Sequence, residues 1–274
     1  MKIKSDYKKD CFDGILYPSE NRKDKVVITL SGSDGGITHA VKMAKYFQAH
    51  GVPALAVGYF RTRHTPKSLS NIPSEYIDKA VVYLKKQGYD KIAIQGVSKG
   101  TEYALLAAAN NPQITCIILK APSWFYGEGL VKGQPSGHSC WQKNGKEIPF
   151  TPYKTRKFNI MKEMKKAGEY NLLSINSDKK TVSESVISIE KANGPILIFS
   201  TKADNVWPSA ESGEKLIERL KANNFQYPFK HICFERMCHI MMENANGMTK
   251  LISKSKKSIL PNVQKKENLW KKKH

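Results

Sequence analysis

Residues 91–109 have the sequence KIAIQGVSKGTEYALLAAA, in which an apolar run, a Gly-x-Ser-x-Gly turn and an alanine-rich run follow one another. This order predicts a buried strand that passes through a sharp turn into a helix. Gly96 and Gly100 remove side chains that would collide across the turn, so Ser98 is raised clear of the sheet. Two glycines and a serine at this spacing also arise by chance, but the predicted strand and helix favour Ser98 as a nucleophile.

An oxyanion that formed beside Ser98 would lie at the amino end of the following helix, where backbone N–H groups carry partial positive charge. The N–H of Lys99 is one candidate donor. The glycine-rich run SGSDGG at 31–36 lacks the phosphate-binding glycine patterns and follows an apolar strand. Its Ser33 or Asp34 is the candidate second donor, and the alternative is a plain turn between a strand and a helix.

Apolar runs and amphipathic runs alternate along most of the chain, which predicts a mostly parallel, doubly wound α/β sheet of the α/β-hydrolase class. Strands are expected at 12–17, 25–30, 54–59, 91–97, 114–119, 195–200 and 229–235. Helices are expected at 39–50, 74–87, 99–109 and 208–223. We expect one domain over residues 1–274.

Residues 121–190 interrupt this alternation and are expected to form a lid or cap over the site, with helices at 158–170 and 182–191. The segment is rich in aromatic residues. The four that we expect to line an apolar substrate site are Trp124, Phe125, Tyr126 and Trp141. The alternative is that these rings anchor the insertion to the main domain.

A serine nucleophile needs a base, and the base needs an acid that sets its tautomer. Asp204 directly follows the strand that ends at Ser200, and His239 follows the strand that ends near Glu235. The chain order serine, aspartate, histidine is that of α/β-hydrolases. Rivals in other places are His39, His50, His138, His231, His274 and Asp178.

The composition limits the other functions of the chain. Lys and Arg total 45 against 24 acidic residues, but the lysines are spread along the chain and no nucleic-acid-binding motif accompanies them. No run approaches the length of a membrane span, and the polar start of the chain lacks the apolar core of an export signal. We therefore expect a cytoplasmic protein with no nucleic-acid partner, no bound metal and no cofactor. The scattered cysteines agree with reduced thiols: Cys11, Cys116, Cys140, Cys233 and Cys238.

The chain resembles the catalytic domain of the acyl-CoA thioester hydrolase and bile acid-CoA:amino acid N-acyltransferase family over nearly all of residues 10–250. The lysine of Gly96-Val-Ser-Lys-Gly100 is more specific to that family than the general turn. Further matching runs are Leu30–Gly36, Ala54–Phe60, Pro66–Leu69 with Glu75 and Tyr76, Gly145–Pro149, Asp204 with Trp207, and His239. The chain departs from the family pattern at Cys238-His239-Ile240, where Gly-His is more usual. We also expect no counterpart of the amino-terminal β-sandwich that longer members carry.

The resemblance implies an acyl-CoA thioesterase with a Ser98–Asp204–His239 triad and a small-molecule acyl thioester as substrate. It also implies hydrolysis and not transfer to an amino acid, because transferases of that family carry cysteine at the nucleophile position. The alternatives are a carboxylesterase of the dienelactone-hydrolase kind, acting on small esters, and a non-catalytic binding protein built on a hydrolase scaffold.

Overall fold

A central sheet organises the computed structural model, which describes residues 2–20, 22–153, 181–204, 206–237 and 239. Within these residues the sheet has eight strands in the order β1-β2-β4-β3-β6-β7-β12-β13. The strands are parallel from β4 to β13, and β1 and β2 join the β4 edge in antiparallel pairs. Their bounds are β1 Ile3–Lys4, β2 Asp13–Tyr17, β3 Lys25–Leu30, β4 Ala54–Gly58, β6 Lys91–Val97, β7 Ile114–Lys120, β12 Ile196–Thr201 and β13 Phe229–Phe234.

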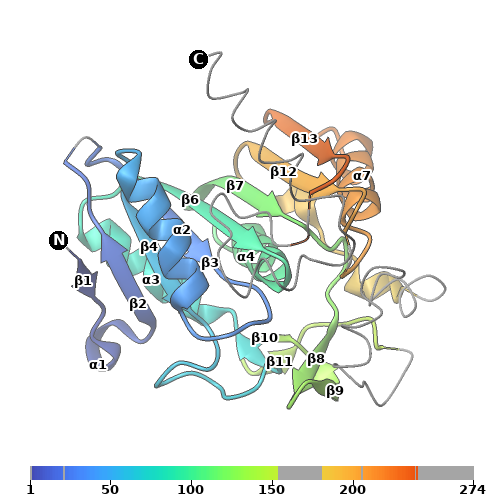
Figure 1. Ribbon diagram of the computed structural model, residues 1–274, viewed down its shortest axis with the longest axis horizontal. Helices are drawn as coiled ribbons and strands as arrows, with labels where there is room; N and C mark the ends of the chain where they lie inside the picture. The colour runs from blue at the N-terminus through green and yellow to red at the C-terminus, as the bar shows by residue number, and fades with distance from the viewer. Residues whose placement is uncertain (1, 21, 154–180, 205, 238, 240–274) are drawn as a thin grey trace.

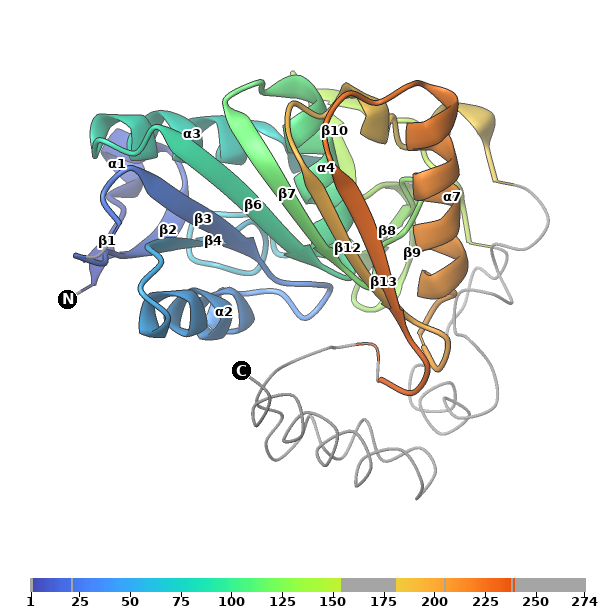
Figure 2. The same ribbon diagram turned by 90° about the horizontal axis from the view of Figure 1, so that it is seen from above.

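Helices cover both faces of the sheet, as the alternating sequence predicts. Figure 2 shows α3, α4 and α7 on one face and α2 on the other, so the sheet is doubly wound. The short α1, by contrast, packs against α3 near the edge of the sheet that β1 forms (Figure 1). The helix bounds are α1 Tyr7–Asp10, α2 Thr38–Ala49, α3 Glu75–Lys86, α4 Lys99–Asn110 and α7 Ser209–Ala222. The prediction of a mostly parallel, doubly wound sheet is confirmed.

Helix α4 lies at the centre of the fold, and every residue from Lys99 to Ala108 is buried. Alanines and leucines allow this because they pack closely and have high helix propensity. The strands beside α4 are β6 and β7, and their fully buried side chains form one large apolar core with those of α4. A rigid core therefore supports the turn that begins α4.

The insertion between β7 and β12 contains strands that the sequence analysis did not anticipate. Strands β8 (Glu128–Val131) and β9 (Gln134–Ser139) form a hairpin, as do β10 (Trp141–Lys143) and β11 (Lys146–Glu147). Both turns place two residues at positive φ, Lys132 with Gly133 and Asn144 with Gly145, a backbone that suits the twist of a two-residue hairpin. Asn-Gly is a strong hairpin signal, so β10 and β11 were open to prediction. Strand β10 also pairs with β5 (Ile72–Pro73) of the main domain.

The predicted helix at 182–191 is wrong. The structure has two 3₁₀ turns instead, η1 (Ser183–Ser185) and η2 (Ile189–Lys191). Val186 between them is extended, with φ −63° and ψ 127°, and the N–H of Ile187 donates to the carbonyl of Trp124. A hydrogen bond between two distant segments thus replaces the hydrogen bond that Ile187 would make within a helix. The predicted helix at 158–170 lies outside the described residues.

Candidate active site

The turn between β6 and α4 has a backbone that only a tightly packed loop tolerates. Ser98 has φ 55° and ψ −127°, a strained conformation for a residue with a side chain. A Cβ on Gly96 would lie 2.2 Å from the carbonyl oxygen of Gly100, and a Cβ on Gly100 would lie 2.2 Å from that of Ser31. Both glycines are therefore required by close backbone contacts, and the strain presents the Ser98 hydroxyl at the carboxyl edge of the sheet.

Three side chains from distant parts of the chain meet at this edge. His239 Nε2 lies 2.8 Å from Ser98 Oγ, and His239 Nδ1 lies 2.9 Å from each carboxylate oxygen of Asp204. All three residues are buried. Asp204 follows β12 and His239 follows β13, and parallel strands bring such loops together at their carboxyl ends. The predicted Ser98, Asp204 and His239 thus form one hydrogen-bonded chain.

The loop after β12 also orients Asp204. The backbone N–H groups of Val206 and Trp207 donate to Asp204 Oδ1, at 2.9 and 3.2 Å. The Trp207 ring meets the His239 ring edge to face, with centroids 4.8 Å apart. Trp207 therefore limits the movement of the imidazole, a contact that residue spacing alone does not reveal.

Two backbone segments border the Ser98 hydroxyl. The N–H of Lys99 is at the first position of α4, where a helix offers no internal acceptor. A Cβ on Gly32 would lie 3.4 Å from Ser98 Oγ, so the 31–36 loop passes beside the serine. The Tyr59 hydroxyl donates to the carbonyl of Gly32 at 2.8 Å, and a trans peptide then directs the N–H of Ser33 away from Tyr59.

Asp34 lies further along the same loop and has other partners. Its carboxylate is 2.8 Å from His39 Nδ1, and its carbonyl accepts a hydrogen bond from Arg61. Ser33 and Asp34 are the two predicted donors on this loop. The N–H of Ser33 belongs to the Gly32–Ser33 peptide group, whose carbonyl accepts the hydrogen bond from the Tyr59 hydroxyl.

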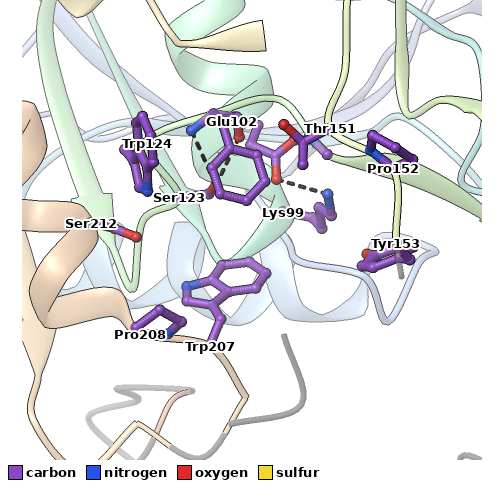
Figure 3. A pocket seen from close by; sticks show the side chains of 12 residues that line it. Lys99, Glu102, Ser123, Trp124, Thr151, Pro152, Tyr153, Trp207, Pro208 and Ser212 are labelled. Atoms are coloured by element: carbon purple, nitrogen blue, oxygen red, sulfur yellow. Dashed lines mark hydrogen bonds and ion pairs between the residues drawn. The ribbon is translucent and has the colours of Figure 1, made fainter. Parts of the chain in front are cut away.

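A narrow cavity lies between α4, the insertion and the start of α7 (Figure 3). Ser98, Asp204 and His239 do not line it, but Trp207, which contacts the His239 ring, does. Its volume is about 30 Å³, room for two or three water molecules at roughly 10–15 Å³ each. The lining includes Trp124 and Phe125 from the insertion and Trp207 beside His239. The other lining residues are Lys99, Glu102, Ser123, Gly127, Thr151, Pro152, Tyr153, Pro208 and Ser212.

The other two aromatic residues predicted for this site, Tyr126 and Trp141, lie in the core and not in the lining. Trp141 is fully buried and stacks on Tyr103, with centroids 4.9 Å apart. Its Nε1 donates to Glu102 at 2.9 Å. These contacts agree with the alternative in which the aromatic rings anchor the insertion.

A buried ion pair, which the residue patterns did not predict, lies below the turn between β6 and α4. Lys99 Nζ lies 2.8 Å from Glu102 Oε1. The other oxygen, Oε2, accepts the N–H of Gly127 at 3.0 Å as well as the Trp141 indole. A Cβ on Gly127 would lie 2.5 Å from Lys99 Nζ, so the glycine makes room for the ammonium. The spacing of Lys99 and Glu102 on one helix face is the signal that could have revealed the pair.

Burial and the charges of neighbouring groups shift the pKa values of Lys99 and Cys140 in opposite directions. Burial lowers the pKa of Lys99, but the neighbouring acidic groups Cys140 and Glu102 outweigh it and the pKa is raised. Burial also raises the pKa of the Cys140 thiol to about 12, although Lys99 counteracts this. At neutral pH the site therefore holds a charged lysine and a protonated thiol.

The rival histidines lie elsewhere. His231 contacts Ser200 Oγ, His138 contacts Glu147, and His50 contacts the carbonyl of Tyr46. Asp178, His274 and Cys238 are outside the described residues. Within the described part of the chain no cluster of histidine, cysteine and acidic residues could hold a metal ion. No helix there is both long and apolar enough to span a bilayer.

Known proteins of similar sequence are thioesterases by name. The mouse peroxisomal succinyl-coenzyme A thioesterase is 26% identical over 208 residues, which cover 74% of this chain and 45% of that protein. Mouse mitochondrial acyl-coenzyme A thioesterase 2 is 23% identical over 82% of this chain and 47% of its own length. The chain thus spans about half the length of the curated relatives it matches. Since those two are named for organelles, a cytoplasmic location stays a prediction.

Solved structures establish the fold. The α/β hydrolase GrgF from a Penicillium species superposes with a TM-score of 0.55 at 17% identity, covering 84% of this chain and 87% of that one. DcsB, solved with a substrate analogue, also has a TM-score of 0.55, at 11% identity, with 88% and 91% covered. The family model for "BAAT / Acyl-CoA thioester hydrolase C terminal" matches residues 72–244, more than half of the chain. The chain therefore has the α/β-hydrolase fold and belongs to the BAAT and acyl-CoA thioester hydrolase carboxy-terminal family.

Proposed function

We propose that this protein hydrolyses acyl thioesters, with acyl-CoA as the substrate class, through a Ser98–His239–Asp204 triad. The observation that carries the proposal is the continuous hydrogen-bonded chain from the Ser98 hydroxyl through the His239 imidazole to the Asp204 carboxylate. Family membership and the names of the relatives support acyl-CoA as the substrate. The formal charge of +21 suits the phosphates of CoA.

In the first half of the reaction, Ser98 Oγ attacks the carbonyl carbon of the acyl group while His239 Nε2 accepts the hydroxyl proton. Asp204 holds the Nδ1 proton and stabilises the imidazolium. The N–H of Lys99 and a second N–H, from Ser33 or Asp34, donate to the oxyanion. The C–S bond then breaks, the proton on His239 passes to the thiolate, and CoA leaves as a thiol.

Water completes the cycle. His239 removes a proton from a water molecule that attacks the ester on Ser98, and the same proton returns to Ser98 Oγ as the free acid leaves. Trp124 and Phe125 contribute the apolar side of the acyl site, next to Trp207. Closure by the 121–190 insertion would exclude bulk water from the ester.

A small-ester hydrolase of the dienelactone-hydrolase kind is the second candidate. It requires the same fold and the same Ser98–His239–Asp204 hydrogen bonds as the thioesterase. Rates on acyl-CoA and on p-nitrophenyl esters, compared at low and high salt, separate the two. Acyl-CoA as the better substrate, with a rate that falls as salt rises, supports the thioesterase.

Labelling with a fluorophosphonate probe tests whether the scaffold is catalytic at all. We expect the probe to modify Ser98, as located by peptide mass spectrometry, and to leave the Ser98→Ala variant unlabelled. Ser123, also buried beside the cavity, provides the matched control, since its hydroxyl donates to the carbonyl of Phe125. Ser123→Ala should still be labelled. A wild-type protein that resists the probe and cleaves neither substrate class supports the non-catalytic alternative.

A further inference from the structure

The hydroxyl of Tyr59 lies beside the loop that follows β3, at the same edge of the sheet as Ser98. Strands β3 and β4 are parallel neighbours with Leu30 opposite Val57, so Gly32 and Tyr59 each lie two residues beyond this pair. Tyr59 Oη is 2.8 Å from the carbonyl oxygen of Ser31 and 2.8 Å from that of Gly32. A phenol has one hydrogen to donate, so two successive carbonyls share it.

The Tyr59 ring is held firmly by its neighbours. It is fully buried, and its centroid lies 4.9 Å from that of Tyr103 and 5.8 Å from that of Trp141. Burial raises the pKa of the Tyr59 hydroxyl well above its ordinary value of 10, so this group keeps its proton at any pH used for an assay. The aromatic core therefore fixes a permanent hydrogen-bond donor under the loop.

The direction of these two carbonyls determines the direction of the N–H groups that follow them. The peptides are trans, so the N–H groups of Gly32 and Ser33 are directed away from Tyr59. Successive N–H groups on one side of a loop form a site for an anion. Within the part of the chain that the structure describes, the N–H of Ser33 has no hydrogen-bond acceptor, and Ser33 is exposed. Gly32, one residue earlier, passes within van der Waals reach of the Ser98 side chain.

We propose that Tyr59 is a positioning residue for the second oxyanion donor, and that this donor is the N–H of Ser33. The inference rests on the proposed function, because the donor acts only if Ser98 forms an oxyanion. Without the Tyr59 hydroxyl, the peptide between Gly32 and Ser33 loses the contact that sets its direction. Loss of an oxyanion donor typically lowers kcat by 10²–10³-fold, and a misdirected donor should lower it by about 10- to 100-fold.

Two matched variants separate positioning from packing. Tyr59→Phe keeps the ring and removes the hydroxyl. Tyr103→Phe makes the same change on the adjacent, equally buried ring, whose hydroxyl donates to the carbonyl of Pro73. Both variants lose one buried hydrogen bond, so both should lower Tm, by about 2–8 °C. On a short p-nitrophenyl ester, only Tyr59→Phe should lower kcat, with KM within about twofold of wild type.

A trifluoromethyl ketone analogue of the substrate measures the oxyanion site by itself. Ser98 Oγ adds to the carbonyl carbon of the ketone, the hydroxyl proton passes to His239, and the carbonyl oxygen becomes a bound oxyanion. Its Ki should rise in Tyr59→Phe by about the same factor as kcat/KM falls, and should not change in Tyr103→Phe. In a crystal structure of the wild-type adduct, we expect the N–H of Ser33 at 2.7–3.1 Å from this oxygen.

The outcomes distinguish this inference from the proposed function. Equal changes of kcat in Tyr59→Phe and Tyr103→Phe, or a rise in KM alone, overturn the positioning role. An adduct oxyanion bound by the N–H of Asp34 and not by that of Ser33 overturns the donor assignment. A wild-type protein that neither cleaves the ester nor reacts with the fluorophosphonate probe contradicts the proposed function, and this inference with it.

Discussion

The ammonium of Lys99 and the carboxylate of Glu102 form an ion pair at 2.8 Å, with side chains only 4% and 1% exposed, directly below the strained serine turn. Glu102 also accepts hydrogen bonds from Gly127 and Trp141 of the insertion. One carboxylate thus joins the first turn of α4 to a segment that enters the fold much later in the sequence. The lysine of the Gly96–Gly100 turn therefore has a structural partner in the core.

Glu102→Gln should be strongly destabilising, because it leaves the Lys99 ammonium buried without its counter-charge. Breaking one partner of a buried pair typically costs about 3–5 kcal/mol of unfolding free energy. The matched control is Glu211→Gln, which removes an exposed helical pair with Lys215 and should cost less than about 1 kcal/mol. Urea unfolding of both variants gives the two values. A Glu102→Gln protein as stable as the control would show that the pair contributes nothing.

Asp204→Asn should retain the fold but lose most turnover. The amide favours the wrong imidazole tautomer, and the corresponding change in a serine protease lowers kcat by about 10⁴-fold. Ser98→Ala should lose on the order of 10⁶-fold, as in the best-studied triad. The measurement is kcat on an acyl-CoA or p-nitrophenyl ester, with circular dichroism as the folding control. More than a tenth of wild-type activity in either variant would falsify its assignment.

Gly100→Ala tests the packing of the turn against expectations from helix propensity. Propensity alone predicts a gain of about 1 kcal/mol for alanine inside a helix. The added Cβ would lie 2.2 Å from the carbonyl oxygen of Ser31, a backbone atom that cannot move independently. We therefore expect a lower Tm and slower labelling of Ser98. A Tm at or above that of wild type would mean that the Ser31–Gly32 backbone moves to accommodate the added Cβ at little cost.

His231 should make the protein less stable in mild acid. Burial lowers its pKa below the ordinary 6.5, although Glu214 partly offsets this, and its Nε2 lies 2.6 Å from Ser200 Oγ. The unfolded chain takes up the proton more readily, so this contribution is complete above about pH 6.5 and is lost as pH falls through the folded pKa. His231→Gln removes the titration. Its Tm should fall less than that of wild type between pH 7.5 and 5, and parallel curves would exclude the effect.

The products distinguish hydrolysis from transfer. With millimolar glycine or taurine in an acyl-CoA assay, we expect free acid and CoA with no detectable amide, because Ser98 forms an oxygen ester that amines attack less readily than a thioester. The buried Cys140 is a protonated thiol with a pKa of about 12 and is no substitute nucleophile. Mass spectrometry of the products decides, and an N-acyl amino acid as the main product contradicts the proposal.

Local sequence patterns predicted the main strands and helices of this fold. The apolar run before Ser98 and the alanine-rich run after it identify β6 and α4, because their residues are buried by neighbours on every side. The chain order of Ser98, Asp204 and His239 was also readable, since parallel strands bring their carboxyl ends together. The mostly parallel sheet and the family assignment agree with the predicted α/β-hydrolase fold.

The sequence by itself determined seven of the eight strands of the sheet, the four long helices that cover it and the candidate triad, because each depends on short-range periodicity or on a rule that relates chain order to one sheet edge. Tertiary structure decided the rest. Trp141 and Glu102 are 39 residues apart, and no local pattern pairs them. The segment 182–191 was predicted as a helix, but a hydrogen bond from the N–H of Ile187 to the carbonyl of Trp124 holds it as two short turns. Contacts between distant segments outweigh local propensity at such places because each buried polar group must find a partner, whichever part of the chain provides it.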